Sequence, residues 1–140
     1  MKKPLILALG LSLAAGVVQA QELFVKLNSP SPMTQGEAMV LANTALEQKA
    51  NVRILLCDAG GDLALAEQDA AKQTALKPRD VTPHQMLQGA IKAGAQVQVC
   101  ALYLPNTGKQ PGDLLEGVTP AQPGDVMQHV LQPGVQTLSF

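Results

Sequence analysis

The sequence predicts one three-layer α/β/α domain built around a mostly parallel sheet of about five strands. Its 140 residues, 46% hydrophobic and 15% charged, suit a single core. Short apolar runs alternate along the chain with stretches of helical spacing. The run at residues 52–57 is apolar except for Arg53, as in a strand buried on both faces of a parallel sheet. This alternation of strands and helices is typical of a sheet covered by helices on both faces.

Each predicted strand is a short apolar run that ends at residues favouring turns, such as Asn, Asp, Gly and Pro. The predicted strands are residues 23–27, 52–57, 96–104, 117–119 and 135–140. In parallel sheets, ligands and chemistry collect at the carboxyl ends of the strands. The segments after the first three strands are therefore the candidate sites. They are residues 28–33, 57–62 and 100–109.

The predicted helices have recognisable starts. Thr34 and Glu37 have the spacing of a capping box, and Thr82 and Gln85 repeat that spacing. Asp62 is predicted to cap a further, Ala-rich helix. The predicted helices span about residues 35–49, 63–72 and 82–94, and a last one begins at residues 123–125.

The first twenty residues have the composition of a secretory leader. Two lysines are followed by the almost wholly apolar residues 4–18, and the small residue Ala20 precedes a polar pair. The apolar run suits a leader better than an uncleaved anchor, because a membrane span needs about 20 residues. We expect a signal peptide at residues 1–20, cleaved after Ala20, and a periplasmic domain at residues 21–140 with no membrane attachment after cleavage.

Charge and aromatic content exclude nucleic-acid binding. Both lysines of the leader count among the ten cations, so residues 21–140 carry eight cations against eleven anions, a net charge of −3. Such a balance provides no strong field to hold a polyanion or an anionic membrane. Phe24, Tyr103 and Phe140 are the aromatic residues, which are too few for base stacking. We therefore expect no nucleic-acid partner.

Several common catalytic motifs are absent from the sequence. It contains no Walker-type loop and no GxGxxG, HExxH, CxxC or GxSxG motif. Two cysteines and two separated histidines lack the spacing of a zinc site. His84, at the start of its helix, is predicted to be neutral, at the surface or hydrogen-bonded, and His129 is predicted to be structural. No metal is expected.

Cys57 and Cys100 hold equivalent places near the carboxyl ends of two predicted strands. Cys57 lies in an apolar run and is interpreted as a core residue. Cys100 precedes a flexible loop and the cation Lys109, so it is either a reactive thiol or a small buried hydrophobe. An oxidising compartment also permits a disulfide between the two. By closing about 43 residues, that disulfide would contribute on the order of 4 kcal/mol.

The turn after the second strand contains weaker candidates. Gly60 and Gly61 either present backbone N–H groups to an anion or form an ordinary strand-to-helix turn. Tyr103 either forms part of a pocket wall or packs in the core. The carboxylates between residues 58 and 69 match no calcium loop and are interpreted as solvated surface.

Two segments around Cys100 carry a resemblance to a known family. They are GAQVQVCALY at residues 94–103 and, after a loop, DLLEGV at residues 113–118. Together with the first two strands and the helix between them, they resemble the DsrE/DsrF/TusD family of small sulfur-relay proteins over nearly all of residues 22–140. In that family, a helix ending in Gly leads to a strand whose terminal cysteine carries sulfane sulfur as a persulfide.

The resemblance implies a DsrE-like α/β fold, assembly into homotrimers or homohexamers, and Cys100 as the sulfur carrier, with no metal or organic cofactor. A sulfur donor and a sulfur acceptor, either proteins or small thiols, would be its partners. Lys109 is a candidate stabiliser of the anion, and residues 104–108 are a candidate gate. The chain departs from the family in its leader, because the relay members usually work in the cytoplasm. It also has YLPN at residues 103–106, where basic residues are common in the family.

We therefore expect a periplasmic sulfur carrier, of sulfurtransferase type, or a thiol-redox protein that acts through Cys100. Two other functions stay open. The chain can be a noncatalytic oligomeric module that binds a small molecule or a protein, or a structural domain stabilised by a disulfide. Titration of free thiols separates the resting carrier from the disulfide-stabilised domain.

Overall fold

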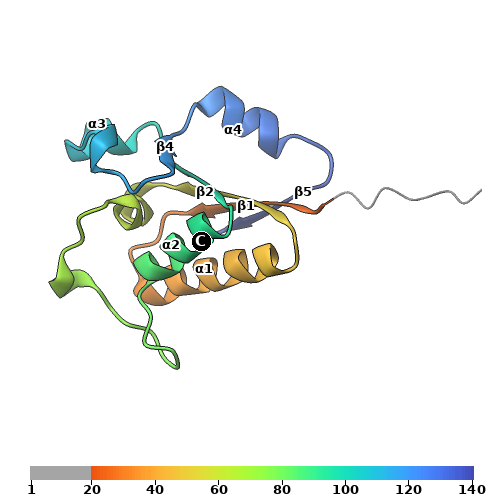
Figure 1. Cartoon of the computed structure of the whole chain (residues 1–140). Helices are drawn as coiled ribbons and strands as arrows, with labels where there is room; N and C mark the ends of the chain where they lie inside the picture. The colour runs from red at the N-terminus through yellow and green to blue at the C-terminus, as the bar shows by residue number, and fades with distance from the viewer. Residues whose placement is uncertain (1–19) are drawn as a thin grey trace, which may run out of the picture.

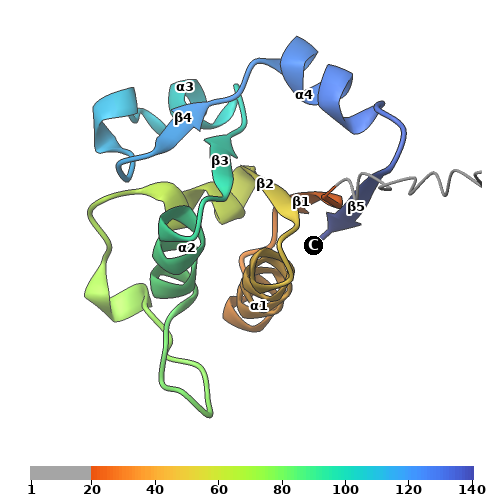
Figure 2. The same cartoon turned by 45° about the vertical axis from the view of Figure 1, so that its right-hand side comes forward.

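The structure, a computed structural model, describes residues 20–140 and confirms the predicted α/β fold. Five strands form one parallel sheet in the order β4-β3-β2-β1-β5 (Figures 1 and 2). The strands are β1 (Glu22–Leu27), β2 (Asn51–Leu56), β3 (Gln96–Val99), β4 (Val118–Pro120) and β5 (Val135–Ser139). Apart from Ala20, the expected signal peptide lies outside the described residues, so its cleavage stays a prediction.

Helices cover both faces of the sheet, as Figure 2 shows from a second side. α1 (Pro32–Glu47) and α2 (Pro83–Lys92) pack side by side on one face, and α4 (Pro123–Val130) lies on the other. Shorter helical turns occupy the remaining connections. They are η1 (Asp58–Ala64), η2 (Ala70–Lys72), α3 (Tyr103–Thr107) and η3 (Pro111–Asp113).

The core consists of two apolar clusters, one on each face of the sheet. Val25 and Ile54 lie in the cluster beneath α1 and α2, whereas Phe24 and Leu55 lie in the cluster that includes Val126 of α4. Successive residues of a strand point to opposite faces, so neighbours in sequence enter different clusters. β2 is therefore buried on both faces, as its apolar run predicted.

The start of α2 is predicted correctly and the start of α1 is not. Thr82 and Gln85 form the predicted capping box at α2. At α1, the predicted box of Thr34 and Glu37 is wrong, because Ser31 is the N-cap and accepts a hydrogen bond from the Thr34 backbone N–H. Proline follows Ser31 at the first helical position, where its fixed φ suits a helix and its missing N–H costs nothing.

The helix predicted over residues 63–72 is also wrong. Asp62 lies inside η1 rather than at a helix N-cap. The backbone after η1 instead pairs with the segment before β4, where the Ala66 N–H donates to Asp113 O at 2.8 Å and the Leu115 N–H donates to Ala64 O at 2.7 Å. These tertiary hydrogen bonds hold the chain in an isolated bridge at Leu65, between the short turns η1 and η2, although its alanine content favours a continuous helix.

The third strand is shorter than predicted. It ends at Val99; of the residues expected to continue it, 100–102 lie in a turn and Tyr103 and Leu104 begin α3. Pro105 falls in the first turn of this short helix, where no backbone N–H is required, and Gly108 ends it in a left-handed conformation with φ 68°. The predicted gate at residues 104–108 is therefore mostly helical.

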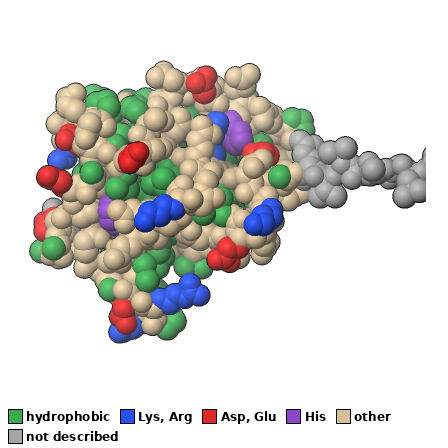
Figure 3. Space-filling model, in the orientation of Figure 1, with side chains coloured by type: hydrophobic (Ala, Val, Ile, Leu, Met, Phe, Trp, Pro, Cys, Tyr) green, Lys and Arg blue, Asp and Glu red, His purple; other side chains and the backbone are tan. Residues whose placement is uncertain are grey.

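None of the described helices has the combination of length and apolar character that a membrane crossing requires. On the face that Figure 3 shows, basic and acidic side chains are interspersed rather than gathered into one patch.

Candidate functional site

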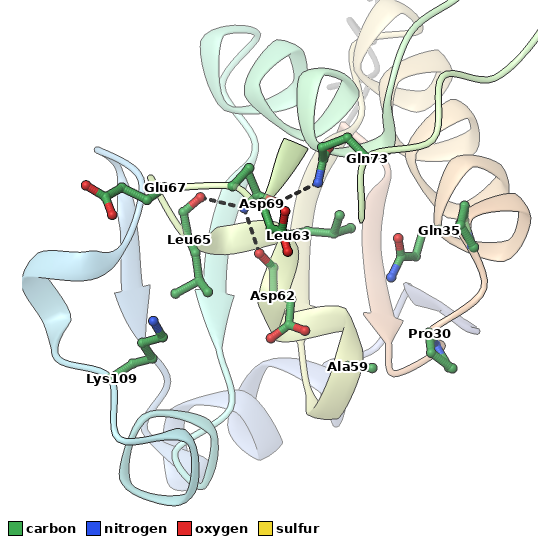
Figure 4. Close-up of a pocket in the computed structure, with 12 residues that line it drawn as sticks. Pro30, Gln35, Ala59, Asp62, Leu63, Leu65, Glu67, Asp69, Gln73 and Lys109 are labelled. Carbon is green, nitrogen blue, oxygen red and sulfur yellow. Dashed lines mark hydrogen bonds between the residues drawn. The ribbon is translucent and has the colours of Figure 1, made fainter. Parts of the chain in front are cut away.

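The three segments predicted to carry chemistry meet at the carboxyl edge of the sheet. A cavity of about 420 Å³ is lined by Pro30 after β1, by Ala59 and Asp62 after β2, and by Lys109 after α3 (Figure 4). Parallel strands bring their carboxyl ends to one edge, so segments far apart in sequence become neighbours. The site therefore combines three loops.

A disulfide joins Cys57 and Cys100 at this edge. β2 and β3 are adjacent in register, with Leu56 opposite Val99, so the residue after each strand end lies beside the other. The Cys100 N–H donates to Leu56 O at 2.8 Å, and the two cysteine Cα atoms are 5.0 Å apart, within the usual range for a disulfide. Of the alternatives that the sequence left open for this pair, the structure contains the bonded one.

The two sulfur-bearing residues differ in accessibility. Cys57 is 8% exposed and packs in the cluster with Phe24, Leu55 and Val126, in agreement with its predicted core position. Cys100 is half-buried. An attacking thiol therefore reaches Cys100 more readily than Cys57, because thiol–disulfide exchange depends on access to the sulfur that is attacked.

A second, larger cavity opens at the disulfide. It has a volume of about 720 Å³ and is lined by both cysteines together with Asp58, Asp62 and Leu102, among others. None of the described residues that line it is basic. Neighbouring carboxylates disfavour the entry of a further negative charge into this cavity.

Lys109 does not line the cavity at the disulfide. Its side chain lines the neighbouring 420 Å³ cavity, which shares the walls Ala59 and Asp62 with the cysteine cavity (Figure 4). The structure therefore joins the predicted site residue Cys100 to Cys57 and places the other predicted site residue, Lys109, in an adjoining cavity. Its expected action on the thiolate stays a prediction.

Tyr103 connects the two segments that carry the cysteines. Its hydroxyl donates a hydrogen bond of 2.6 Å to Asp62 Oδ1, and its side chain is 4% exposed. Burial, and next the hydrogen bond and charge of Asp62, raise the pKa of Tyr103 above its ordinary value. Tyr103 thus serves both as a packed residue and as a wall of the cysteine cavity.

Gly60 and Gly61 are required by close packing. A Cβ at Gly60 would collide with the backbone carbonyl of Leu27, and a Cβ at Gly61 would collide with the ring of Tyr103. Close approach of a backbone or ring explains these glycines without the bound anion that the sequence also allowed.

Neither histidine lines the cavity at the disulfide. His84 is buried, with Nδ1 2.8 Å from Leu63 O, so the hydrogen-bonded alternative for it is correct. His129 lies against Phe24, with ring centroids 6.1 Å apart. Burial and then the positive charge of Arg53 lower the pKa of His129, although its place near a helix end favours a cation. Within residues 20–140, no three acidic, histidine or cysteine side chains are grouped to hold a metal ion.

The sheet order and the helices on its two faces define an α/β protein of DsrE-like fold, here with a disulfide at its carboxyl edge. Among solved structures, the chain is similar to the ychN protein from E. coli, with a TM-score of 0.70 and 18% identity over 86% of this chain and 99% of that chain. It is also similar to MTH1491 from Methanobacterium thermoautotrophicum, a protein of unknown function, with a TM-score of 0.60 and 10% identity over the same shares of the two chains.

No family model and no curated protein sequence matches the chain. The structural likeness confirms the fold that the residues around Cys100 suggested. At these identities it concerns the fold alone.

Proposed function

We propose that this chain is an exported thiol protein whose Cys57–Cys100 pair alternates between disulfide and dithiol, and whose reduced Cys100 carries sulfane sulfur. The observation that supports this proposal best is the position of the disulfide. It lies at the edge of the sheet where ligands collect, beside a cavity of about 720 Å³, with one half-buried sulfur and one buried sulfur.

The disulfide is reduced in two exchanges. The thiolate of a reductant attacks Cys100 Sγ, forms a mixed disulfide there and displaces Cys57 as a thiolate. A second thiol of the reductant then attacks the reductant sulfur that is bonded to Cys100, and Cys100 is released as a thiolate. Two electrons and two protons pass to the cysteine pair, and the reductant leaves as a disulfide.

Sulfur transfer follows without net oxidation. The Cys100 thiolate attacks the outer sulfur of a donor persulfide, the donor S–S bond breaks, and the donor leaves as a thiolate. An acceptor thiolate then removes the outer sulfur from Cys100. The donor and acceptor are persulfides and thiols, on proteins or small molecules, so the reaction requires neither a metal nor an organic cofactor.

A structural disulfide is the second candidate. Cys57 packs in the apolar cluster with Phe24 and Val126, as a stabilising bond would. Under this alternative, the disulfide resists a monothiol reductant while the protein is folded, and Cys100 takes up no sulfur after forced reduction.

Intact-mass measurement tests the proposal. Cys57→Ser and Cys100→Ser variants, reduced and freed of reductant, are exposed to a low-molecular-weight persulfide. We expect Cys57→Ser to gain the mass of one sulfur atom, which cyanide then removes, and Cys100→Ser to gain none. An equal gain in both variants, or no gain in Cys57→Ser, contradicts a carrier role for Cys100.

We also propose that the chain is exported and forms a homotrimer or homohexamer. The leader composition supports export, and N-terminal sequencing of the periplasmic fraction tests cleavage after Ala20. Exposed Met33, Val40 and Leu41 on α1 support assembly, because a helix surface of this kind is suited to contact another subunit. Light scattering after size-exclusion chromatography distinguishes these assemblies from a monomer.

A further inference from the structure

We infer that Cys57 attacks a persulfide formed on Cys100 and thereby releases its outer sulfur as sulfide. This inference rests on the proposed function and adds to it a reaction product, hydrogen sulfide. The protein is then a dithiol-dependent persulfide reductase as well as a carrier. Sulfane sulfur that enters at Cys100 leaves as hydrogen sulfide unless an acceptor thiol removes it first.

The backbone keeps the two sulfurs within bonding reach. Leu56 lies opposite Val99 in the parallel register, the Cys100 N–H donates to Leu56 O at 2.8 Å, and the Cys57 N–H donates to Leu27 O at 2.9 Å. These hydrogen bonds belong to the sheet edge and do not depend on the disulfide. After reduction they continue to hold the cysteine Cα atoms near their present separation of 5.0 Å.

An internal thiol at this distance competes strongly with any thiol from solution. Holding two reacting groups together turns a bimolecular step into a unimolecular one, with effective molarities far above the concentration of any free thiol. The disulfide itself establishes that Cys57 Sγ can bond to Cys100 Sγ, which is the inner sulfur of the persulfide.

The step balances in atoms and electrons. The Cys57 thiolate attacks Cys100 Sγ, the bond between Sγ and the outer sulfur breaks, and the outer sulfur leaves as hydrosulfide. One S–S bond forms and one breaks. In total, the dithiol gives two electrons to the sulfane sulfur and becomes a disulfide, while the donor persulfide becomes a donor thiol and hydrogen sulfide. A dithiol, or two monothiols, must then reduce the disulfide for the next turnover.

Accessibility and charge favour this order of events. Cys57 is buried in the apolar cluster, so an incoming persulfide meets Cys100 first. Asp58 and Asp62 line the cavity, and no described lining residue is basic, so neither a persulfide anion nor released hydrosulfide is retained by an opposite charge. Each feature favours passage of sulfur through the site over its storage there.

Single-turnover measurements test the inference. The full chain and the Cys57→Ser and Cys100→Ser variants are reduced, freed of reductant without oxygen, and mixed with a low-molecular-weight persulfide. Sulfide, free thiols and intact mass are then followed together. We expect the unaltered chain to release one sulfide per chain, lose both thiols and keep no extra sulfur. Cys57→Ser should retain one added sulfur and release no sulfide above a donor-only blank.

The outcomes separate this inference from the proposed function. If Cys57→Ser takes up no sulfur, the carrier function fails and the inference fails with it. If Cys57→Ser takes up sulfur but the unaltered chain also stores it with Cys57 still free, only the inference is overturned. Sulfide release at equal rates from the unaltered chain and Cys100→Ser overturns the inference as well, because Cys57 would then act directly on the donor.

Discussion

The hydroxyl of Tyr103 donates a 2.6 Å hydrogen bond to Asp62, and this bond ties α3 to η1 beside the disulfide. Tyr103 follows Cys100 closely in sequence, and Asp62 follows Cys57 in the same way. The two segments that carry the sulfurs are therefore joined a second time, by a bond that reduction leaves in place.

We predict that the chain's single tyrosine ionises at higher pH when the protein is folded than when it is unfolded. Burial and Asp62 raise the pKa of Tyr103 in the folded state. The associated stability is present below the ordinary tyrosine value of about 10 and is lost as pH rises through the raised pKa. Tyrosinate absorbance measures this directly. Asp62→Asn should shift the folded titration toward lower pH, and equal titrations in the folded and unfolded states would contradict the prediction.

Removing the disulfide should lower the free energy of unfolding by about 4 kcal/mol, because the bond closes a loop of 43 residues in the unfolded chain. Urea unfolding with and without a dithiol reductant measures the loss. The control is the double variant Cys57→Ser/Cys100→Ser, whose unfolding midpoint should not respond to reductant. A reductant-insensitive midpoint in the unaltered chain would count against the bond.

Neutralising Asp58 should speed the alkylation of Cys100. In a Cys57→Ser background, Asp58→Asn removes a negative charge from the cavity, and we expect roughly a twofold faster reaction with iodoacetamide at neutral pH and low salt. Asparagine suits the positive φ of 48° at this position.

A matched control exists at Asp80, an exposed aspartate with a positive φ of 54° that does not line the cavity. Asp80→Asn should leave the alkylation rate unchanged. An equal acceleration by both substitutions would mean that overall charge, rather than the cavity, controls the thiol.

Acidification should destabilise the protein through His129. Burial and Arg53 lower its pKa in the folded state, so the stability it contributes is full above the ordinary value of about 6.5 and is lost as pH falls through the lowered pKa. Urea midpoints between about pH 8 and about pH 5 measure this dependence. His129→Leu should flatten it, and Arg53→Gln should raise the ring's pKa in an NMR titration. A folded pKa at or above 6.5 would contradict the prediction.

The strands and the start of α2 were predictable because the sequence patterns that specify them are local. The apolar run at β2 and the capping box of Thr82 and Gln85 each specify one element without help from the rest of the chain. The prediction of a helix after Asp62 was wrong because backbone pairing between Ala66 and Asp113, which are far apart in sequence, overrides the helix propensity of this segment.

The candidate site was predictable in outline but not in its connections. The rule for carboxyl ends located the segments of Cys57, Cys100 and Lys109 correctly. Bonding between the cysteines depends on register, because a one-residue shift between β2 and β3 would separate them, and periodicity does not specify register between strands. The pairing of Tyr103 with Asp62 had no signal in sequence spacing.

β1 pairs with β2 on one side and with β5, the last strand in the chain, on the other, where Glu22 lies opposite Val135. The Phe140 N–H also donates to Lys26 O at 2.9 Å. A chain that emerges N-terminus first presents β1 long before β5, so one edge of β1 stays without its native partner until synthesis reaches β5. Such long-range pairing is slow to form. Until β5 pairs with β1, the partly formed sheet is exposed to misassembly. An oxidant that acts during this interval oxidises the cysteines before the native fold is complete.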